Sequence, residues 1–168
     1  MKPKLQDIAI RTELRPGDIG TVICQHGVYY GREHGFGIQF ETYVALGLHE
    51  FYERYDSSRD RVWVCEHEGR MVGFLLVMHR PADAAQLRYF LVLPEYRGIG
   101  LGRKLMELFL QFVTERGYRS AYLWTVDELP VAAALYRRFG FRLTEEKPSM
   151  SFGKPLREQR YDLVVTGG

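Results

Sequence analysis

The chain has 168 residues, which is enough for one domain with a hydrophobic core, and we expect a single domain over residues 1–168. Hydrophobic residues make up 46% and charged residues 26%, and the formal net charge of +2 gives no indication of nucleic-acid binding. No apolar run has the length of a membrane span or a signal peptide, so we expect a cytoplasmic protein without a membrane partner.

The hydrophobic pattern of the first half predicts a strand, two helices and a hairpin. Isoleucines that alternate with polar residues mark the strand, and apolar residues three and four positions apart mark the helices. Glycines at positions 35 and 37 separate the two helices. The expected ranges are 8–10, 19–30, 40–55, 61–66 and 71–78.

The pattern of the second half predicts the order strand, helix, strand, helix, strand, strand. Pro94 stops the first of these strands, because proline cannot donate to a strand ladder. The expected strands are 85–93, 121–126, 141–144 and 161–165, and the expected helices are 101–113 and 131–139. The whole order, β-α-α-β-β-β-α-β-α-β-β, predicts a mixed α/β fold with about seven strands and helices on both faces of the sheet.

A glycine-rich turn from Arg97 to Gly102 lies between a predicted strand and the clearest predicted helix. Glycines let backbone N–H groups approach a ligand, and a helix start adds unpaired donors and a partial positive charge. Together these features favour a pyrophosphate site, to which the side chains of Arg97 and Arg103 could contribute. The alternative interpretation is a helix-start turn that binds no ligand.

The spacing of the turn decides between kinds of phosphate ligand. Arg103 stands five residues after Gly98, so the turn is not a Walker A loop, G-x-x-x-x-G-K-[ST]. Arg103 also occupies the third position of a G-x-G-x-x-G dinucleotide fingerprint. The pattern that fits is R-x-x-G-x-G, formed by Arg97, Gly100 and Gly102.

Three segments in this order resemble the coenzyme A-binding core of the GNAT superfamily. Residues 87–94 look like its central strand, residues 96–102 like its acyl-CoA loop, and residues 132–141 like its A-x-x-L-Y-x-x-x-G-F signature. The segments 15–18 and 151–154 also resemble the acetyltransferase half of bacterial proteins that fuse a MarR-type winged helix to a GNAT domain. With no room for a winged helix before Ile8, the chain would be the acetyltransferase part alone.

The resemblance implies a GNAT fold with a splayed sheet and an acyltransferase (EC 2.3.1.-) that uses acetyl-CoA as co-substrate and no metal. The pantetheine arm would pair with backbone groups of the splayed strand. The turn would hold the pyrophosphate, and the short helix would pack on the other side of the cofactor. The implied cofactor-binding residues are Leu91, Val92, Leu93, Arg97, Gly98, Ile99, Gly100, Leu101, Gly102, Arg103 and Ala132.

Tyr136 is the implied catalytic residue, because the matching tyrosine of the family acts as general acid toward the CoA thiolate. The alternative is an aromatic residue that only packs. One departure concerns the asparagine that many members carry seven residues before this tyrosine, where this chain has Leu129. The cofactor contact there is missing or replaced, with Asp127 as a candidate. Met150 similarly stands where the fused relatives often have histidine.

The acceptor side of the site is less defined. In the family the first two helices wall the acceptor pocket, where His26, Tyr30 and Glu33 share one helical face and are candidate substrate-binding residues. Such a stripe can equally belong to the core. The candidates for the general base are His26, Glu33, Glu41, His49 and Asp127.

The predicted function is therefore an N-acetyltransferase that moves an acetyl group from acetyl-CoA to a primary amine of a small molecule, such as an amino acid. The amine would attack directly in a ternary complex. Alternatives are a protein N-terminal or lysine acetyltransferase, a bulkier acyl donor, a non-catalytic acyl-CoA sensor and an interaction domain. No histidine or cysteine cluster has metal-ligand spacing. Family members are often dimers, which makes a homodimer one option.

Overall fold

The protein is built around a single seven-stranded sheet. The computed structural model describes residues 1–166. Across the sheet the strands follow the order β1-β2-β3-β4-β5-β7-β6. Their bounds are β1 Ala9–Arg11, β2 Arg61–His67, β3 Arg70–Arg80, β4 Ala84–Val92, β5 Ser120–Val126, β6 Arg142–Ser149 and β7 Leu156–Val164. The helices are α1 Asp18–His34, α2 Ile38–Glu53, α3 Leu101–Glu115 and α4 Pro130–Arg138, with short 3₁₀ turns at Leu5–Asp7 and Pro94–Tyr96.

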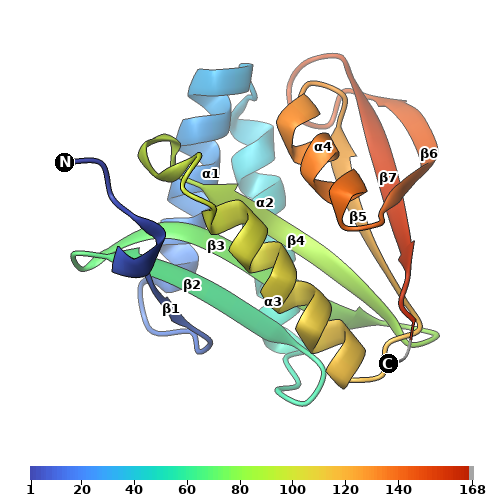
Figure 1. Cartoon of the computed structure of the whole chain (residues 1–168). Helices are drawn as coiled ribbons and strands as arrows, with labels where there is room; N and C mark the ends of the chain where they lie inside the picture. The colour runs from blue at the N-terminus through green and yellow to red at the C-terminus, as the bar shows by residue number, and fades with distance from the viewer. Residues whose placement is uncertain (167–168) are drawn as a thin grey trace.

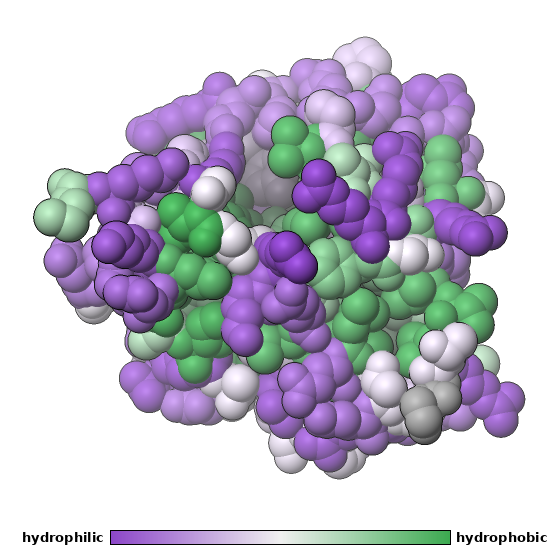
Figure 2. All heavy atoms as spheres, viewed as in Figure 1, coloured by the Kyte–Doolittle hydropathy of each residue, from purple (hydrophilic) through white to green (hydrophobic). Residues whose placement is uncertain are grey.

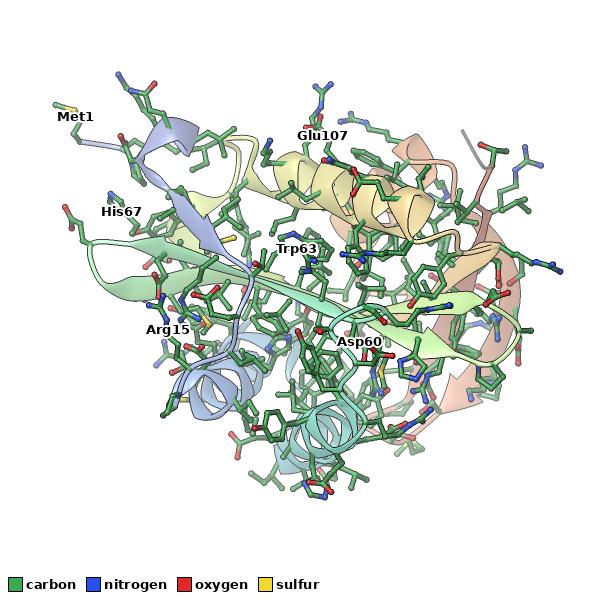
Figure 3. All side chains as sticks on the ribbon, turned by 90° about the horizontal axis from the view of Figure 1, so that it is seen from below. Met1, Arg15, Asp60, Trp63, His67 and Glu107 are labelled. Atoms are coloured by element: carbon green, nitrogen blue, oxygen red, sulfur yellow. The ribbon has the colours of Figure 1, made fainter. Side chains whose placement is uncertain are left out.

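Helices cover both faces of the sheet, as predicted. Helices α1 and α2 lie on one face and α3 on the other, which the views in Figure 1 and Figure 3 show from two directions. The predicted order of strands and helices is confirmed over its whole length. Only β4 and β5 are parallel, and every other neighbouring pair is antiparallel, so the sheet is mixed.

Each face of the sheet has its own hydrophobic core. The core under α3 contains Trp63, whose ring meets Phe112 of that helix edge-on at a centroid distance of 5.9 Å (Figure 3). The core under α1 and α2 contains Val44, Leu48 and Phe51 of α2, all at most 1% exposed. These residues recur at helical spacing, which is why the sequence pattern identified the helix.

The last two strands are longer than predicted. The sequence pattern gave strands 141–144 and 161–165, whereas β6 continues to Ser149 and β7 already begins at Leu156. Seven of the eight β6 residues are exposed, so the strand has no apolar alternation to reveal it. Its pairing with β7 along most of its length comes from backbone hydrogen bonds instead.

Strands β4 and β5 separate soon after they begin, and this splay creates the central gap of the molecule. They pair at only three positions, Ala84 with Ser120, Ala85 with Ala121 and Gln86 with Tyr122. Beyond these pairs β4 continues on β3, while β5 continues on β7, and the two strands diverge (Figure 1). The splayed sheet expected from the resemblance is therefore present.

A bulge interrupts β4 at the edge of this gap. The register between β3 and β4 shifts between Phe74 and Leu76, and Tyr89 opposite has a left-handed backbone with φ of 58°. The bulge lets the consecutive residues Arg88 and Tyr89 both reach α2, where a Cβ on Gly47 would overlap the Tyr89 hydroxyl. Strict alternation would have sent one of the two side chains to the opposite face.

Candidate functional site

A cavity lies where β4 and β5 diverge. Its volume is about 120 Å³. Figure 2 shows a hollow on this face, between the turn that precedes α3 and helix α4. The cavity is lined by His26, Tyr30, Phe36, Phe40, Tyr43, Gln86, Leu87, Arg88, Tyr89, Phe90, Trp124, Thr125, Val126, Leu129, Ala132, Tyr136, Phe152 and Glu158.

The turn before α3 has the backbone geometry of an anion site. Gly98 and Gly100 adopt φ of 76° and 91°, a left-handed conformation that residues with a Cβ rarely adopt. Gly100 is the N-cap of α3, and its carbonyl accepts the first intrahelical bond, from the N–H of Lys104. The N–H groups of the three residues between them therefore have no partner within the helix.

Arg97 and Glu33, which were expected to meet different ligands, bind each other. The Arg97 guanidinium donates to both Glu33 carboxylate oxygens, at 2.6 and 2.8 Å, and to the carbonyl oxygen of Val92 at 3.0 Å. This hydrogen bonding lowers the pKa of Glu33 below its usual range. Glu33 does not line the cavity, and its carboxylate lies beside the turn.

Arg103, the other arginine of the turn, is mostly exposed. Its guanidinium contacts Glu107 one helical turn further on, at 3.1 Å. Exposed pairs of this kind are weak, so the side chain can turn toward an anion at little cost.

The edge of β4 that faces the gap is formed by Phe90 and Val92. The carbonyl oxygen of Phe90 accepts from the Tyr30 hydroxyl at 3.5 Å, and that of Val92 accepts from Arg97. Neither donor belongs to β3, so both oxygens face away from that strand. The N–H of Leu93 instead donates to Val72 of β3 at 3.0 Å. Because backbone groups alternate along a strand, Leu91 faces β3 as well. Leu91 and Leu93 therefore bond to β3, and the backbone groups that face the gap are those of Phe90 and Val92.

Tyr136 of α4 stands in the cavity wall on the α3 side of the sheet. It is 5% exposed, and its ring lies 6.2 to 6.3 Å from the rings of Phe90, Phe141 and Tyr161. Burial raises the pKa of its hydroxyl well above the usual range, so the group stays protonated. Ala132, one turn earlier on the same helix, lines the cavity too.

His26 and Tyr30 of α1, the two candidate acceptor-binding residues of that helix beside Glu33, line the cavity. The His26 ring is 2% exposed, and its Nδ1 lies 2.8 Å from the carbonyl oxygen of Val22, so Nδ1 donates and Nε2 carries the lone pair. Burial lowers the pKa of His26 to about 4, which makes it a weak base. Burial raises the pKa of Tyr30 to about 12.

The other candidate bases lie elsewhere. Glu41, His49 and Asp127 are not among the residues that line the cavity, and Asp127 accepts a hydrogen bond from the N–H of Arg157 at 3.2 Å. Leu129, which stands where many family members carry asparagine, does line the cavity.

Sequence reasoning missed the two fully charged side chains of the cavity, Arg88 and Glu158. Glu158 lies on the part of β7 that the hydrophobic pattern did not predict, opposite Val126 of β5. Arg88 lies within the predicted strand, but the bulge beside it determines the direction and the contacts of its side chain. The alternation of a longer β7 would have been the signal for Glu158.

The comparisons with known proteins agree with this geometry. Residues 38–141, more than half of the chain, match the model of the acetyltransferase (GNAT) family. The chain belongs to the GNAT acetyltransferase family. It is therefore an acyltransferase by family, and the family uses acetyl-CoA.

Curated relatives of this GNAT protein are N-acetyltransferases. It is 32% identical to the uncharacterized N-acetyltransferase YjgM of Escherichia coli K12, over 73% of this chain and 74% of the relative. It is 30% identical to N-acetyltransferase family 8 member 2 of Rattus norvegicus, over 65% of this chain. That match spans about half, 52%, of the rat protein.

Solved structures share the GNAT fold at low sequence identity. A GNAT acetyltransferase from Staphylococcus aureus Mu50 superposes with a TM-score of 0.74 at 20% identity, over 94% of this chain and 100% of the other. Spermidine N-acetyltransferase from Vibrio cholerae, solved with CoA and spermine, gives 0.70 at 19% identity, over 95% and 96%.

Residues 1–166 contain neither a candidate metal-binding cluster nor a helix that could span a membrane. In that range, no three histidine, cysteine, aspartate or glutamate side chains gather as a metal ion would require. Over the same range, every helix is too short or too polar for a membrane span.

Proposed function

We propose that this GNAT protein transfers the acetyl group of acetyl-CoA to a primary amine of a small molecule, within a ternary complex. The observation that carries the proposal is the cavity in the splay, which the edge of β4, helix α4 and helices α1 and α2 enclose together. One cavity thus brings the strand edge that lacks a neighbouring strand and a buried tyrosine within reach of the same ligand.

The residues present fit acetyl-CoA. The unpaired N–H groups after Gly100 suit a pyrophosphate, and the gap-facing backbone of Phe90 and Val92 suits the amides of a pantetheine arm. Bound acetyl-CoA supplies the acetyl group as an activated thioester.

The side chains of the cavity suit direct transfer. Tyr136 keeps its proton at neutral pH and can donate it to a thiolate that leaves beside it. A backbone N–H of the splayed edge can stabilise negative charge on a carbonyl oxygen. No cysteine is among the residues that line the cavity, and burial raises the pKa of Cys65 to about 12, which disfavours an acyl-enzyme.

The size and walls of the cavity support a small acceptor. Aromatic side chains close it from α1, α2 and the segment before β7, where Phe36, Phe40 and Phe152 pack with ring centroids 4.9 to 5.4 Å apart. A bound acceptor would be surrounded on several sides, which suits a metabolite better than an extended polypeptide.

The test combines calorimetry with a thiol-release assay. Acetyl-CoA is titrated into the protein first, and release of CoA is then followed with a panel of amino acids, polyamines and short peptides. Binding together with release for a small amine supports the proposal. Release only with peptides indicates a protein acetyltransferase, binding without release indicates a sensor, and failure to bind acetyl-CoA overturns the enzyme assignment.

A further inference from the structure

Arg88 has unused hydrogen-bonding capacity inside the cavity. Its side chain is only 10% exposed and lines the cavity wall on the α2 side. The guanidinium stacks near the rings of Tyr43 and Tyr89, at 5.5 and 4.7 Å from their centroids, and one nitrogen lies 4.0 Å from the sulfur of Met78. A guanidinium has five N–H donors, so most of its donors remain for a ligand.

The nearest carboxylate does not use these donors. Glu50 of α2 comes no closer to Arg88 than 3.8 Å, beyond hydrogen-bond distance. The other oxygen of Glu50 is held by Arg80 at 2.7 Å and by Arg54 at 3.3 Å. Glu50 thus offsets part of the positive charge of Arg88 but leaves its donors available to a second carboxylate.

Glu158 provides the opposite charge across the same cavity. It lies on β7 opposite Val126, and Val126 belongs to the core on the α1 and α2 face, so Glu158 faces the same side as Arg88. Within residues 1–166 its carboxylate has neither a hydrogen bond nor an ion pair. Among the residues that line the cavity, Arg88 is the only arginine or lysine and Glu158 the only aspartate or glutamate, and burial lowers the pKa of His26 to about 4.

The walls between the two charges are mostly apolar. Aromatic and aliphatic side chains from α1, α2, β5 and the segment before β7 make up most of the other lining residues, and His26, Gln86 and Thr125 add polar groups. We infer that the acceptor is an amino acid with an apolar side chain, whose carboxylate binds Arg88 and whose ammonium binds Glu158 before transfer. This inference rests on the proposed function and assigns the acceptor class to its site.

Two other acceptor classes fit this arrangement less well. A polyamine would bring a second positive charge toward Arg88, where like charges repel in a buried setting. A lysine side chain or a protein N-terminus has no free carboxylate beside its amine, so it would leave the N–H donors of Arg88 without an acceptor on the ligand.

The experiment compares three acceptors that differ in one group. Phenylalanine, phenylalaninamide and phenethylamine share the ring and the primary amine, and only phenylalanine has a carboxylate. Leucine and its amide form a second pair, and aspartate, lysine and spermidine complete the panel. The amide has the weaker base of each pair, so more of it is in the reactive neutral form. A preference for the free acid therefore cannot come from amine reactivity.

We expect kcat/KM for phenylalanine or leucine to exceed that for its amide by about 10- to 100-fold, because the amide cannot make the charge-assisted hydrogen bond to Arg88. Arg88→Gln should raise KM for the free acid by a similar factor, leave KM for acetyl-CoA unchanged and remove the preference over the amide. Arg88→Lys should restore part of it. Arg61→Gln is the control, because the Arg61 guanidinium also stacks on an aromatic ring, 4.8 Å from the centroid of Phe112, but does not line the cavity.

The outcomes separate this inference from the function on which it rests. Acetylation of amines without a preference for the carboxylate, or a preference that Arg88→Gln does not change, overturns the inference and leaves the acetyltransferase proposal intact. Preference for aspartate, lysine or spermidine overturns the apolar acceptor. Absence of acetylation for every small amine overturns the proposed function and the inference together.

Discussion

Replacing Tyr136 with phenylalanine removes one oxygen atom from the cavity wall and keeps the ring that packs there. The ring contacts with Phe90, Phe141 and Tyr161 do not involve the hydroxyl, which makes no hydrogen bond within residues 1–166. The free energy of unfolding should therefore change by less than about 1 kcal/mol. If the hydroxyl is the general acid, kcat should fall by about 10²-fold, or about 2.7 kcal/mol in the barrier.

The assay is CoA release at saturating acceptor, with single-turnover rates to separate chemistry from product release. Because burial raises the pKa of Tyr136, the wild-type hydroxyl stays protonated through neutral pH, and the loss should be the same at each pH there. Tyr161→Phe is the matched control, since Tyr161 packs beside Tyr136 but does not line the cavity. A Tyr136→Phe single-turnover rate within twofold of wild type would refute the acid role.

Three further predictions concern stability and its dependence on pH. Gly100→Ala places a Cβ at φ of 91°, which should cost about 1–2 kcal/mol, lower Tm by several degrees and raise KM for acetyl-CoA; an unchanged KM would remove the turn from the cofactor site. Burial raises the pKa of Asp18, but hydrogen bonds from Arg11 at 2.7 Å and from the N–H of Arg15 outweigh this and lower it overall. Asp18→Asn should therefore cost about 3 kcal/mol in urea unfolding at pH 7, and the difference should shrink as pH falls below 3.8; an equal difference at pH 3 would contradict the ion pair. The pKa of His26 is lowered from 6.5 to about 4, so the unfolded chain binds the extra proton first and wild type should lose about 3 kcal/mol as pH falls through that interval. His26→Gln should flatten this part of the stability profile, and an unaltered slope would show that His26 is not neutral in the folded protein.

The order of helices and strands could be predicted because apolar residues repeat with the period of each element. Helix α3 is the clearest case, since its stripe faces one core along its whole length. The ends of strand β6 could not be predicted from an apolar repeat. Its residues Glu145, Glu146 and Lys147 are exposed, and what keeps them in the sheet is backbone pairing with β7.

The residues of the candidate site fall into two groups, those that a local motif identifies and those that only the fold brings together. The turn and Tyr136 are local motifs, so a few consecutive residues identified them. Arg88 and Glu158 are 70 positions apart, and they share a cavity because of a bulge at Tyr89 and the register of β7 on β5. Neither the bulge, which has no glycine, nor a register between distant strands leaves a short-range signal.

The three paired positions between β4 and β5 have a consequence for the protein's lifetime as well as its chemistry. Within residues 1–166, these pairs and one backbone bond beside them, from the N–H of Arg119 to the carbonyl oxygen of Asp83 at 2.9 Å, join the β1–β4 half of the sheet to the β5–β7 half, so the sheet has a narrow seam. A ligand that bonds along the open part of this seam acts as an additional strand. Its binding raises stability by RT ln(1 + [L]/Kd), which reaches about 2.7 kcal/mol at a hundredfold excess over Kd. Resistance to unfolding and proteolysis would then follow the supply of that ligand, with amides beside the seam gaining the most protection from hydrogen exchange.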